Sequence, residues 1–140
     1  ARLAGADLPP RKIDGLDVWP ILRGDRGATH PHAAYFIYYN QGDLLAVRSG
    51  DWKLFFPHTS QTLGGKPGGT NGVPAPYQRL AVGTELYNLR QDPAERVNVI
   101  ADYPEVRDRL LALAEGAREE LGDRRLQRVG SGVRPPGRVE

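Results

Sequence analysis

The ten residues VRSGDWKLFF, residues 47–56, restrict the fold of this chain more than any other stretch. Read with the two-residue period of a β-strand, Trp52, Leu54 and Phe56 share one face, and Lys53 points to the other. Between two alternating runs lies a Gly-Asp pair, which suits a tight turn because glycine adopts a positive φ at little cost. The stretch therefore predicts a β-hairpin with one strongly apolar face.

Two further segments have the composition of β-strands. AAYFIYY, residues 33–39, is rich in aromatic and β-branched side chains, and the NQGD that follows is a turn signal. TELYNL, residues 84–89, ends at a Gln-Asp-Pro turn. Together with the hairpin of residues 44–56, these segments predict four strands. The connection over residues 57–83 is rich in glycine and proline and longer than most, so we predict a functional or disordered loop there.

The clearest single element is a helix over residues 102–121. Asp102 and Glu105 resemble a capping box, and Pro104 is tolerated in the first helical turn. Gly122 is expected to end the helix. Apolar side chains recur at steps of four and three residues and predict one apolar stripe, made of Val106, Leu110, Leu113, Ala117 and Leu121.

These elements together predict an α+β fold. It consists of a four-stranded antiparallel sheet with one long C-terminal helix packed on one face, a long Gly/Pro-rich loop and an extended tail. One helix covers one face of such a sheet, while the other face also carries aromatic side chains. A bare aromatic face of that size is unusual on a soluble monomer, so we expect further protein to cover it.

Along the chain we expect three parts. Residues 1–24 combine what resembles the end of a helix, capped by Gly5, with a short helix whose N-terminus is capped by Asp17. Residues 25–122 hold the sheet and the long helix. Residues 123–140 form a basic tail with five arginines and too few apolar residues to fold by itself. Because the chain begins at the end of a helix, we expect it to be part of a longer protein.

Composition and motifs exclude several chemistries. The chain has no cysteine, hence no disulfide framework, thiolate nucleophile or cysteine-based zinc site. A net charge of +2 is too mild to indicate nucleic acid binding, and no aromatic residues are interleaved with the basic tail. Lys66 follows a glycine but precedes a proline, so the phosphate-binding loop motif is absent. No apolar run reaches the roughly 20 residues that a membrane span needs.

The three histidines need separate interpretations. His30 and His32 would face the same way on a strand and could share a metal. No third ligand is evident, so surface histidines flanking a proline explain this pair better. His58 follows the apolar strand end and opens the glycine-rich loop, a place where binding residues often lie. The alternative for His58 is an exposed loop histidine without a function.

Four segments, in order, resemble one family. They are KIDGLDVWPILRG, YYNQGDLLAVRSGDWKLFFPH, ELYNLRQDPAERVNVI and YPEVRDRLLALAEGAREELGD. The AVRSGxWKL hairpin and the ELYNLxxDPxExxN turn carry the likeness, which is to the carboxyl-terminal region of arylsulfatase-type sulfatases in the alkaline phosphatase superfamily. Each segment is weakly specific alone, but the four in order cover nearly the whole chain.

The resemblance implies a small α+β subdomain whose sheet has one face under the helix and the other packed on the catalytic domain of the same protein. On this interpretation Trp52, Leu54 and Phe56, or the opposite face, are buried against that domain. Arg48 and Lys53 then lie on the alternate side. The whole protein would hydrolyse sulfate esters, and its substrate would be a sulfated small molecule or a sugar.

The resemblance also implies where the chemistry lies. Sulfatases use a formylglycine, made from Cys or Ser in a C/S-x-P-x-R motif, whose hydrate attacks sulfur near a bound calcium. This chain contains neither that motif nor the family's Asp/Asn metal cluster. We therefore assign it no catalytic residue and no metal ligand, expect calcium and formylglycine in the catalytic domain, and expect the chain alone to be inactive.

Substrate-binding residues are expected on the long loop. His58 would bond a sugar hydroxyl or a sulfate oxygen, and Lys66 and Arg79 would add positive charge for an anionic substrate. Many relatives have a histidine shortly after WKL, where this chain has Phe55. Two other functions stay open: a related phosphoesterase or phosphonate hydrolase, and a free-standing interaction module that uses the same sheet.

Overall fold

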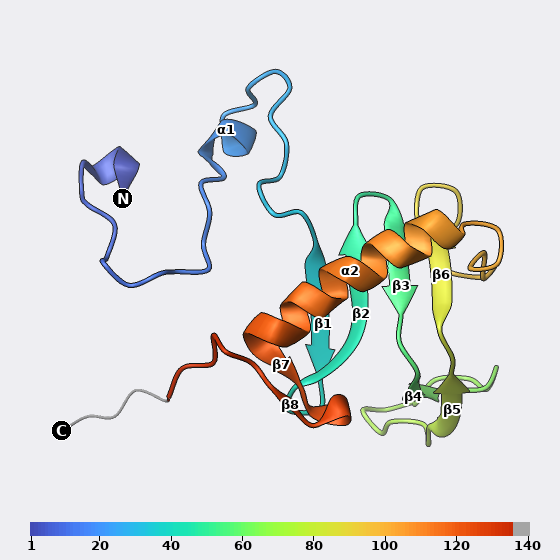
Figure 1. Ribbon diagram of the computed structural model, residues 1–140. Coiled ribbons are helices and arrows are strands. Elements are labelled where there is room, and N and C mark those ends of the chain that lie inside the picture. Colours follow the sequence, from blue (N-terminus) through green and yellow to red (C-terminus); the bar gives the residue numbers. More distant parts are fainter. Residues whose placement is uncertain (136–140) are drawn as a thin grey trace. The chain divides into compact units, whose positions relative to one another are not determined.

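The computed structural model describes residues 1–135, and residues 136–140 of the expected tail lie outside this range. The described chain forms two units, residues 1–33 and a second unit that begins at Ala34 (Figure 1).

The first unit contains two short helical segments. The segment η1 (Arg2–Ala4) is a 3-10 turn that ends at Gly5, which has a left-handed φ of 63°. The helix α1 (Trp19–Leu22) begins where the backbone amide of Trp19 donates to Asp17 Oδ1, at 2.9 Å. The C-cap Gly5 agrees with the prediction, but the N-cap position of α1 is Val18 rather than Asp17.

The second unit is built on a four-stranded antiparallel sheet. Its strands are β1 (Tyr35–Tyr39), β2 (Asp43–Ser49), β3 (Trp52–Phe55) and β6 (Glu85–Asn88), in the spatial order β1-β2-β3-β6. The sheet and the one long helix across it confirm the predicted α+β fold (Figure 1). The turn between β2 and β3 places Gly50 at a φ of 59°, as expected for the Gly-Asp pair.

The connection between β3 and β6 is long, as expected, but its ends form strands that the sequence analysis did not predict. β4 (His58–Thr62) and β5 (Gln78–Val82) pair in an antiparallel hairpin. Only residues 63–77 form the glycine-rich tip. The sequence of β4, HTSQT, lacks the apolar alternation that marks a half-buried strand, so the pattern that predicts strands is missing.

The long helix α2 (Pro104–Leu121) differs from the prediction at its N-terminus and agrees with it at its C-terminus. The capping box is wrong: the N-cap position is Tyr103, no side chain caps it, and Asp102 lies before it. Pro104 takes the first helical position, where its missing N–H would lack a partner in any case. Gly122 ends the helix with a φ of 85°, as predicted.

The hydrophobic core lies between α2 and one face of the sheet. Leu110 and Ala114 of α2 form one buried cluster with Val47, Leu54 and Leu86, which stand side by side on three neighbouring strands. Ala114 was absent from the predicted stripe; its small side chain lets a helix lie close to a sheet. Leu121, which the stripe included, is 47% exposed.

The apolar face of the β2–β3 hairpin is covered from within the chain. Leu54 and Phe56 belong to the buried cluster, and the ring of Trp52 lies 4.8 Å from that of Tyr103, centroid to centroid. The expectation that Trp52, Leu54 and Phe56 meet another domain is therefore wrong. The opposite face of the sheet is the one that α2 leaves uncovered.

The start of the expected extended tail is folded. β7 (Gly122–Asp123), η2 (Arg124–Leu126) and β8 (Arg128–Val129) form a small hairpin beside α2 (Figure 1). The buried carboxylate of Asp123 receives the guanidinium of Arg118, with Nε 3.0 Å from Oδ2. Ion pairs rather than apolar area hold this segment, which is why its composition suggested a tail.

Candidate functional site: a polar pocket beside an uncovered sheet face

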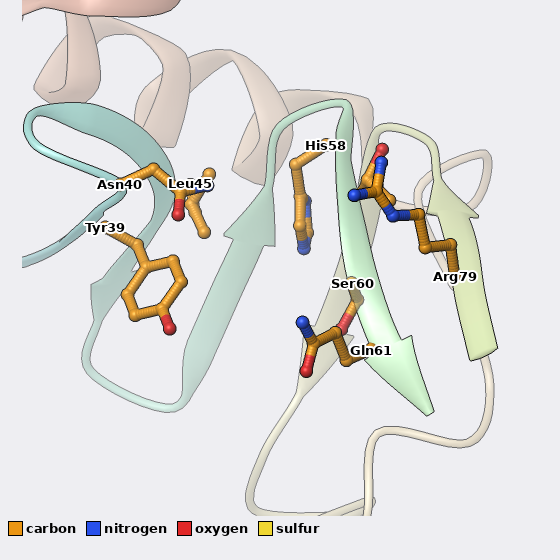
Figure 2. Close-up of a pocket in the computed structure, with 8 residues that line it drawn as sticks. Tyr39, Asn40, Leu45, His58, Ser60, Gln61 and Arg79 are labelled. Carbon is orange, nitrogen blue, oxygen red and sulfur yellow. The ribbon is translucent and has the colours of Figure 1, made fainter. Parts of the chain in front are cut away.

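A polar pocket of about 450 Å³ opens between the β1–β2 turn and the β4–β5 hairpin. Figure 2 shows Tyr39 and Leu45 on one side of the space, with His58 and Gln61 across from them. Its size falls within the range of small-ligand pockets in proteins. The lining residues are Tyr39, Asn40, Leu45, His58, Thr59, Ser60, Gln61 and Arg79.

The β1–β2 turn forms one wall of the pocket in an uncommon backbone conformation. Asn40 and Gln41 have φ values of 47° and 64°, in the left-handed region that asparagine tolerates better than most residues. The pairing of β1 with β2 shifts register between Ile37 and Tyr38, just before this turn. Tyr39, which is 67% exposed, and Asn40 both line the pocket, so this wall presents an aromatic ring and a side-chain amide.

The imidazole of His58 is held by two contacts at the end of β3. Its Nδ1 lies 2.7 Å from the carbonyl oxygen of Phe56, and its ring stacks on that of Phe55 with centroids 5.7 Å apart. A carbonyl oxygen only accepts, so Nδ1 carries the hydrogen. Within residues 1–135 Nε2 forms no hydrogen bond, and it is the nitrogen left for a ligand.

The structure brings two of the three expected substrate-binding residues to one pocket. His58 and Arg79 both line it, from the paired strands β4 and β5. Lys66 does not line it; this residue is exposed at the tip formed by residues 63–77. Arg79 is exposed and forms no ion pair within residues 1–135, so its charge is unneutralised at the pocket.

A buried carboxylate lies directly behind the turn. Asp43 pairs with Arg124, whose Nε is 2.9 Å from Oδ1. Hydrogen bonding to Arg124 lowers the pKa of Asp43, and the polar side chain of Asn40 acts in the same direction. The pocket wall is thus tied to the C-terminal hairpin through a charged pair.

The face of the sheet away from α2 carries an aromatic and charged network, in which Tyr87 is itself buried. The ring of Phe55 lies 4.3 Å from Lys53 Nζ and 6.0 Å from the ring of Tyr87, both measured to its centroid. Lys53 pairs with Glu95 at 2.7 Å, and the Tyr87 hydroxyl donates to Glu85 Oε2 at 2.7 Å. Burial and this carboxylate raise the pKa of Tyr87 to about 12.

The edge of the same face is open. Arg48 pairs in register with Tyr35 on one side and with Lys53 on the other, which places all three on the face away from α2, as the alternation predicts for Arg48 and Lys53. Tyr35 is 69% exposed. An exposed aromatic edge next to already paired charges is a surface suited to protein contact.

Metal-ligating side chains do not converge anywhere in residues 1–135: no group of three or more His, Cys, Asp or Glu is placed to hold an ion. His30 and His32 lie in the first unit with ring centroids 5.2 Å apart, and the Nδ1 of His30 accepts the backbone amide of His32. The calcium that the resemblance implies has no site among these residues. No helix within residues 1–135 combines the length and hydropathy of a membrane span.

The half of the pocket that the β1–β2 turn supplies was not predicted from the sequence. NQGD was identified as a turn, but its role as a wall depends on where β4 lies, and β4 was not predicted. A signal for Tyr39 did exist: it is an aromatic residue directly before a turn, at the end of a strand with several other aromatic residues.

Comparison with known proteins identifies what this arrangement is similar to. Residues 30–136 match the family described as the C-terminal region of aryl-sulfatase. Steryl-sulfatase of Mus musculus is 34% identical over 139 residues, which is 86% of this chain and 21% of the relative. Arylsulfatase A of Homo sapiens is 32% identical over 108 residues, 71% of this chain and 20% of the relative. Arylsulfatase A of Bos taurus is 32% identical over 115 residues, with 76% and 21% covered. The chain spans about a fifth of the length of these relatives.

Proposed function

Because this chain belongs to the aryl-sulfatase family, as its C-terminal region, we propose that it is the C-terminal subdomain of an enzyme that hydrolyses aryl or carbohydrate sulfate esters. Its role is to complete the fold of that enzyme and to form one wall of the substrate cleft. The observation that carries this proposal is the polar pocket with His58 and Arg79, in a chain whose residues 30–136 match the family.

The proposed partner of the subdomain is the catalytic domain of the same protein, docked on the sheet face that α2 leaves uncovered. The exposed ring of Tyr35 marks that face. Two of its polar groups are already paired, since Lys53 pairs with Glu95 and Tyr87 bonds Glu85. Burying paired polar groups costs less than burying unpaired ones, so this network is compatible with a protein interface.

Hydrolysis of a sulfate ester breaks the bond between sulfur and the alcohol oxygen; water supplies the new oxygen on sulfur and the proton on the alcohol. The resemblance implies that a formylglycine hydrate and a calcium in the catalytic domain supply the attack on sulfur. Residues of this chain bind and orient. Arg79 offsets the negative charge of the substrate. His58 Nε2 donates to a sulfate oxygen when the ring is protonated, or accepts from a hydroxyl when it is neutral.

Lys66 belongs to the same proposal in a weaker role. It lies at the tip between β4 and β5, outside the pocket lining, and contributes positive charge to the surroundings of the pocket rather than a contact inside. Its effect is therefore on the rate at which an anionic substrate arrives, and salt is expected to reduce that effect.

The test uses the full-length enzyme with His58→Ala and two substrates, a sulfated monosaccharide and 4-nitrophenyl sulfate. Removing the hydrogen bond between His58 and a hydroxyl of the sugar is expected to raise the KM for the sugar about tenfold and leave kcat for the small aryl sulfate unchanged. His32→Ala, a histidine of the other unit, is the control. Unchanged kinetics on both substrates would make His58 an exposed loop residue.

The same preparation separates the alternatives. Faster turnover of 4-nitrophenyl phosphate than of 4-nitrophenyl sulfate would favour a phosphoesterase of the same superfamily. A full-length gene product with no esterase activity on either compound would favour an interaction module.

A further inference from the structure

The C-terminal hairpin contacts the turn that forms one wall of the pocket. The backbone amide of Arg124 donates to the carbonyl of Gly42 at 2.9 Å. Its guanidinium spans the Asp43 carboxylate, with Nε–Oδ1 at 2.9 Å and Nη2–Oδ2 at 3.3 Å. Asp43 also pairs in register with Tyr39, which lines the pocket. A single buried residue, Asp43, therefore joins Arg124 to the pocket wall.

The turn needs such support because of its backbone. Asn40, Gln41 and Gly42 all have positive φ, at 47°, 64° and 117°. Consecutive residues in this region are intrinsically unfavourable for side chains other than glycine, and they persist where their surroundings hold them. Arg124 holds the end of this turn at two points. Its backbone amide donates to the carbonyl of Gly42, and its guanidinium donates to the side chain of the next residue, Asp43.

Because Asp43 is buried, its position beside the turn depends on the guanidinium of Arg124. The side chain of Asp43 is only 6% exposed, whereas that of Arg124 is 57% exposed. Without Arg124, the carboxylate would have to take up a proton or turn toward water, because a buried charge without a partner is strongly disfavoured. Either response breaks the ion pair that ties Asp43, the residue directly after the turn, to the C-terminal hairpin.

We propose that Arg124 is a positioning residue: through Asp43 it fixes the wall formed by Tyr39 and Asn40, and so sets how tightly the pocket holds the part of the substrate remote from the reacting ester. The functional half of this inference rests on the proposed function, in which the pocket is a wall of the substrate cleft. The positioning half stands on the contacts alone.

The hairpin provides its own control. Arg128 pairs in the β7–β8 register with Asp123 and forms an ion pair with Glu115 of α2. Mutating Arg128 to alanine removes the same charge from the same hairpin as mutating Arg124. Arg128 does not line the pocket, however, and its partner Glu115 lies on the helix α2. A general loosening of the hairpin would therefore follow either change, whereas loosening of the pocket wall would follow loss of Arg124.

The positioning half is tested by amide hydrogen exchange on the 140-residue chain. Arg124→Ala is expected to speed exchange across residues 39–44 by about tenfold, with the β3 and β6 amides unchanged, because local opening is governed by local contacts. Arg128→Ala is expected to leave residues 39–44 within about twofold of wild type. Equal effects of the two variants, or no effect of Arg124→Ala, would overturn the proposal. If Arg124→Ala fails to fold, Asp43→Asn replaces it, because this variant breaks the same ion pair without leaving a buried charge unpaired. It is expected to speed exchange across residues 39–44 in the same way.

The functional half is tested in the full-length enzyme with the sulfated monosaccharide and 4-nitrophenyl sulfate. Arg124→Ala is expected to raise KM for the sugar about fivefold without changing kcat for the aryl sulfate, with partial rescue by Arg124→Lys and no change in Arg128→Ala. If exchange responds but neither Arg124→Ala nor His58→Ala alters the sugar KM, the pocket is not a substrate wall and the functional half is refuted with it. If His58→Ala raises KM and Arg124→Ala does not, the pocket stands and the role of Arg124 is overturned.

Discussion

Truncating Leu110 to alanine tests the central architectural claim, that one helix on one sheet face forms the core. Leu110 has no exposed surface and belongs to the buried cluster with Leu54 and Leu86. Leu→Ala at a fully buried site costs about 2–5 kcal/mol, from the lost transfer free energy and the cavity left behind. A domain of this size has a total stability of about 5–15 kcal/mol, so the loss is a large share of it.

Urea denaturation followed by tryptophan fluorescence provides the measurement. The chain has two tryptophans, and a Trp19→Phe background leaves Trp52, whose ring packs on Tyr103 at the N-terminal end of α2. With an m-value of about 1–3 kcal/mol/M, the expected loss lowers the urea midpoint by about 1–3 M. Far-ultraviolet circular dichroism of the same samples checks that helix and tertiary contact are lost together.

Leu121→Ala is the matched control, because it makes the same chemical change on the same helix at a position that is 47% exposed. Its effect should stay below about 1 kcal/mol. A Leu110→Ala loss no larger than that of Leu121→Ala would refute the assignment of the core. Leu110→Asp should abolish the folded state, since the introduced carboxylate has no partner in the cluster.

Two further predictions concern the chain by itself. It should not hydrolyse 4-nitrophenyl sulfate, with or without calcium, and turnover above the uncatalysed rate in a mass-verified sample would contradict the proposed division of chemistry. Its uncovered sheet face should bind a hydrophobic dye or drive self-association, and a Tyr35→Glu variant should reduce either signal. A third concerns pH: Arg124 lowers the pKa of Asp43 below its ordinary 3.8, so this pair stabilises the fold above that value and the contribution is lost as pH falls below it. Unfolding measured from pH 7 down to pH 2 should therefore be less pH-dependent in Asp43→Asn, and an unchanged profile would contradict the pairing.

The parts of the fold that local patterns determine could be predicted from the sequence. The β2–β3 hairpin follows from strict alternation around a Gly-Asp turn, and α2 follows from apolar spacing closed by Gly122. The face that α2 covers could not be predicted. Both faces of the hairpin carry aromatic side chains, Trp52 and Phe56 on one and Phe55 on the other, so alternation alone does not say which face meets the helix.

The candidate site was predictable in part for a related reason. His58 and Arg79 could be nominated because they lie on a long connection after an apolar strand. Asn40 and Asp43 could not, because their roles depend on Arg124, which is about 80 residues away in sequence and was assigned to a tail. Ion pairs between distant segments leave no periodic signal in the sequence.

The two walls of the pocket differ in how freely their length and sequence can vary between related proteins, because only one of them is the β4–β5 hairpin. β3 and β6 are neighbours in the sheet, so the hairpin is an excursion that leaves the sheet and returns to it. Doubling the length of such an excursion adds only about 0.6 kcal/mol of closure cost. The wall with His58 and Arg79 can therefore be lengthened, shortened or grafted without disturbing the core. The wall with Asn40 is tied through the Asp43–Arg124 ion pair to the C-terminal hairpin, and it can change only together with that partner.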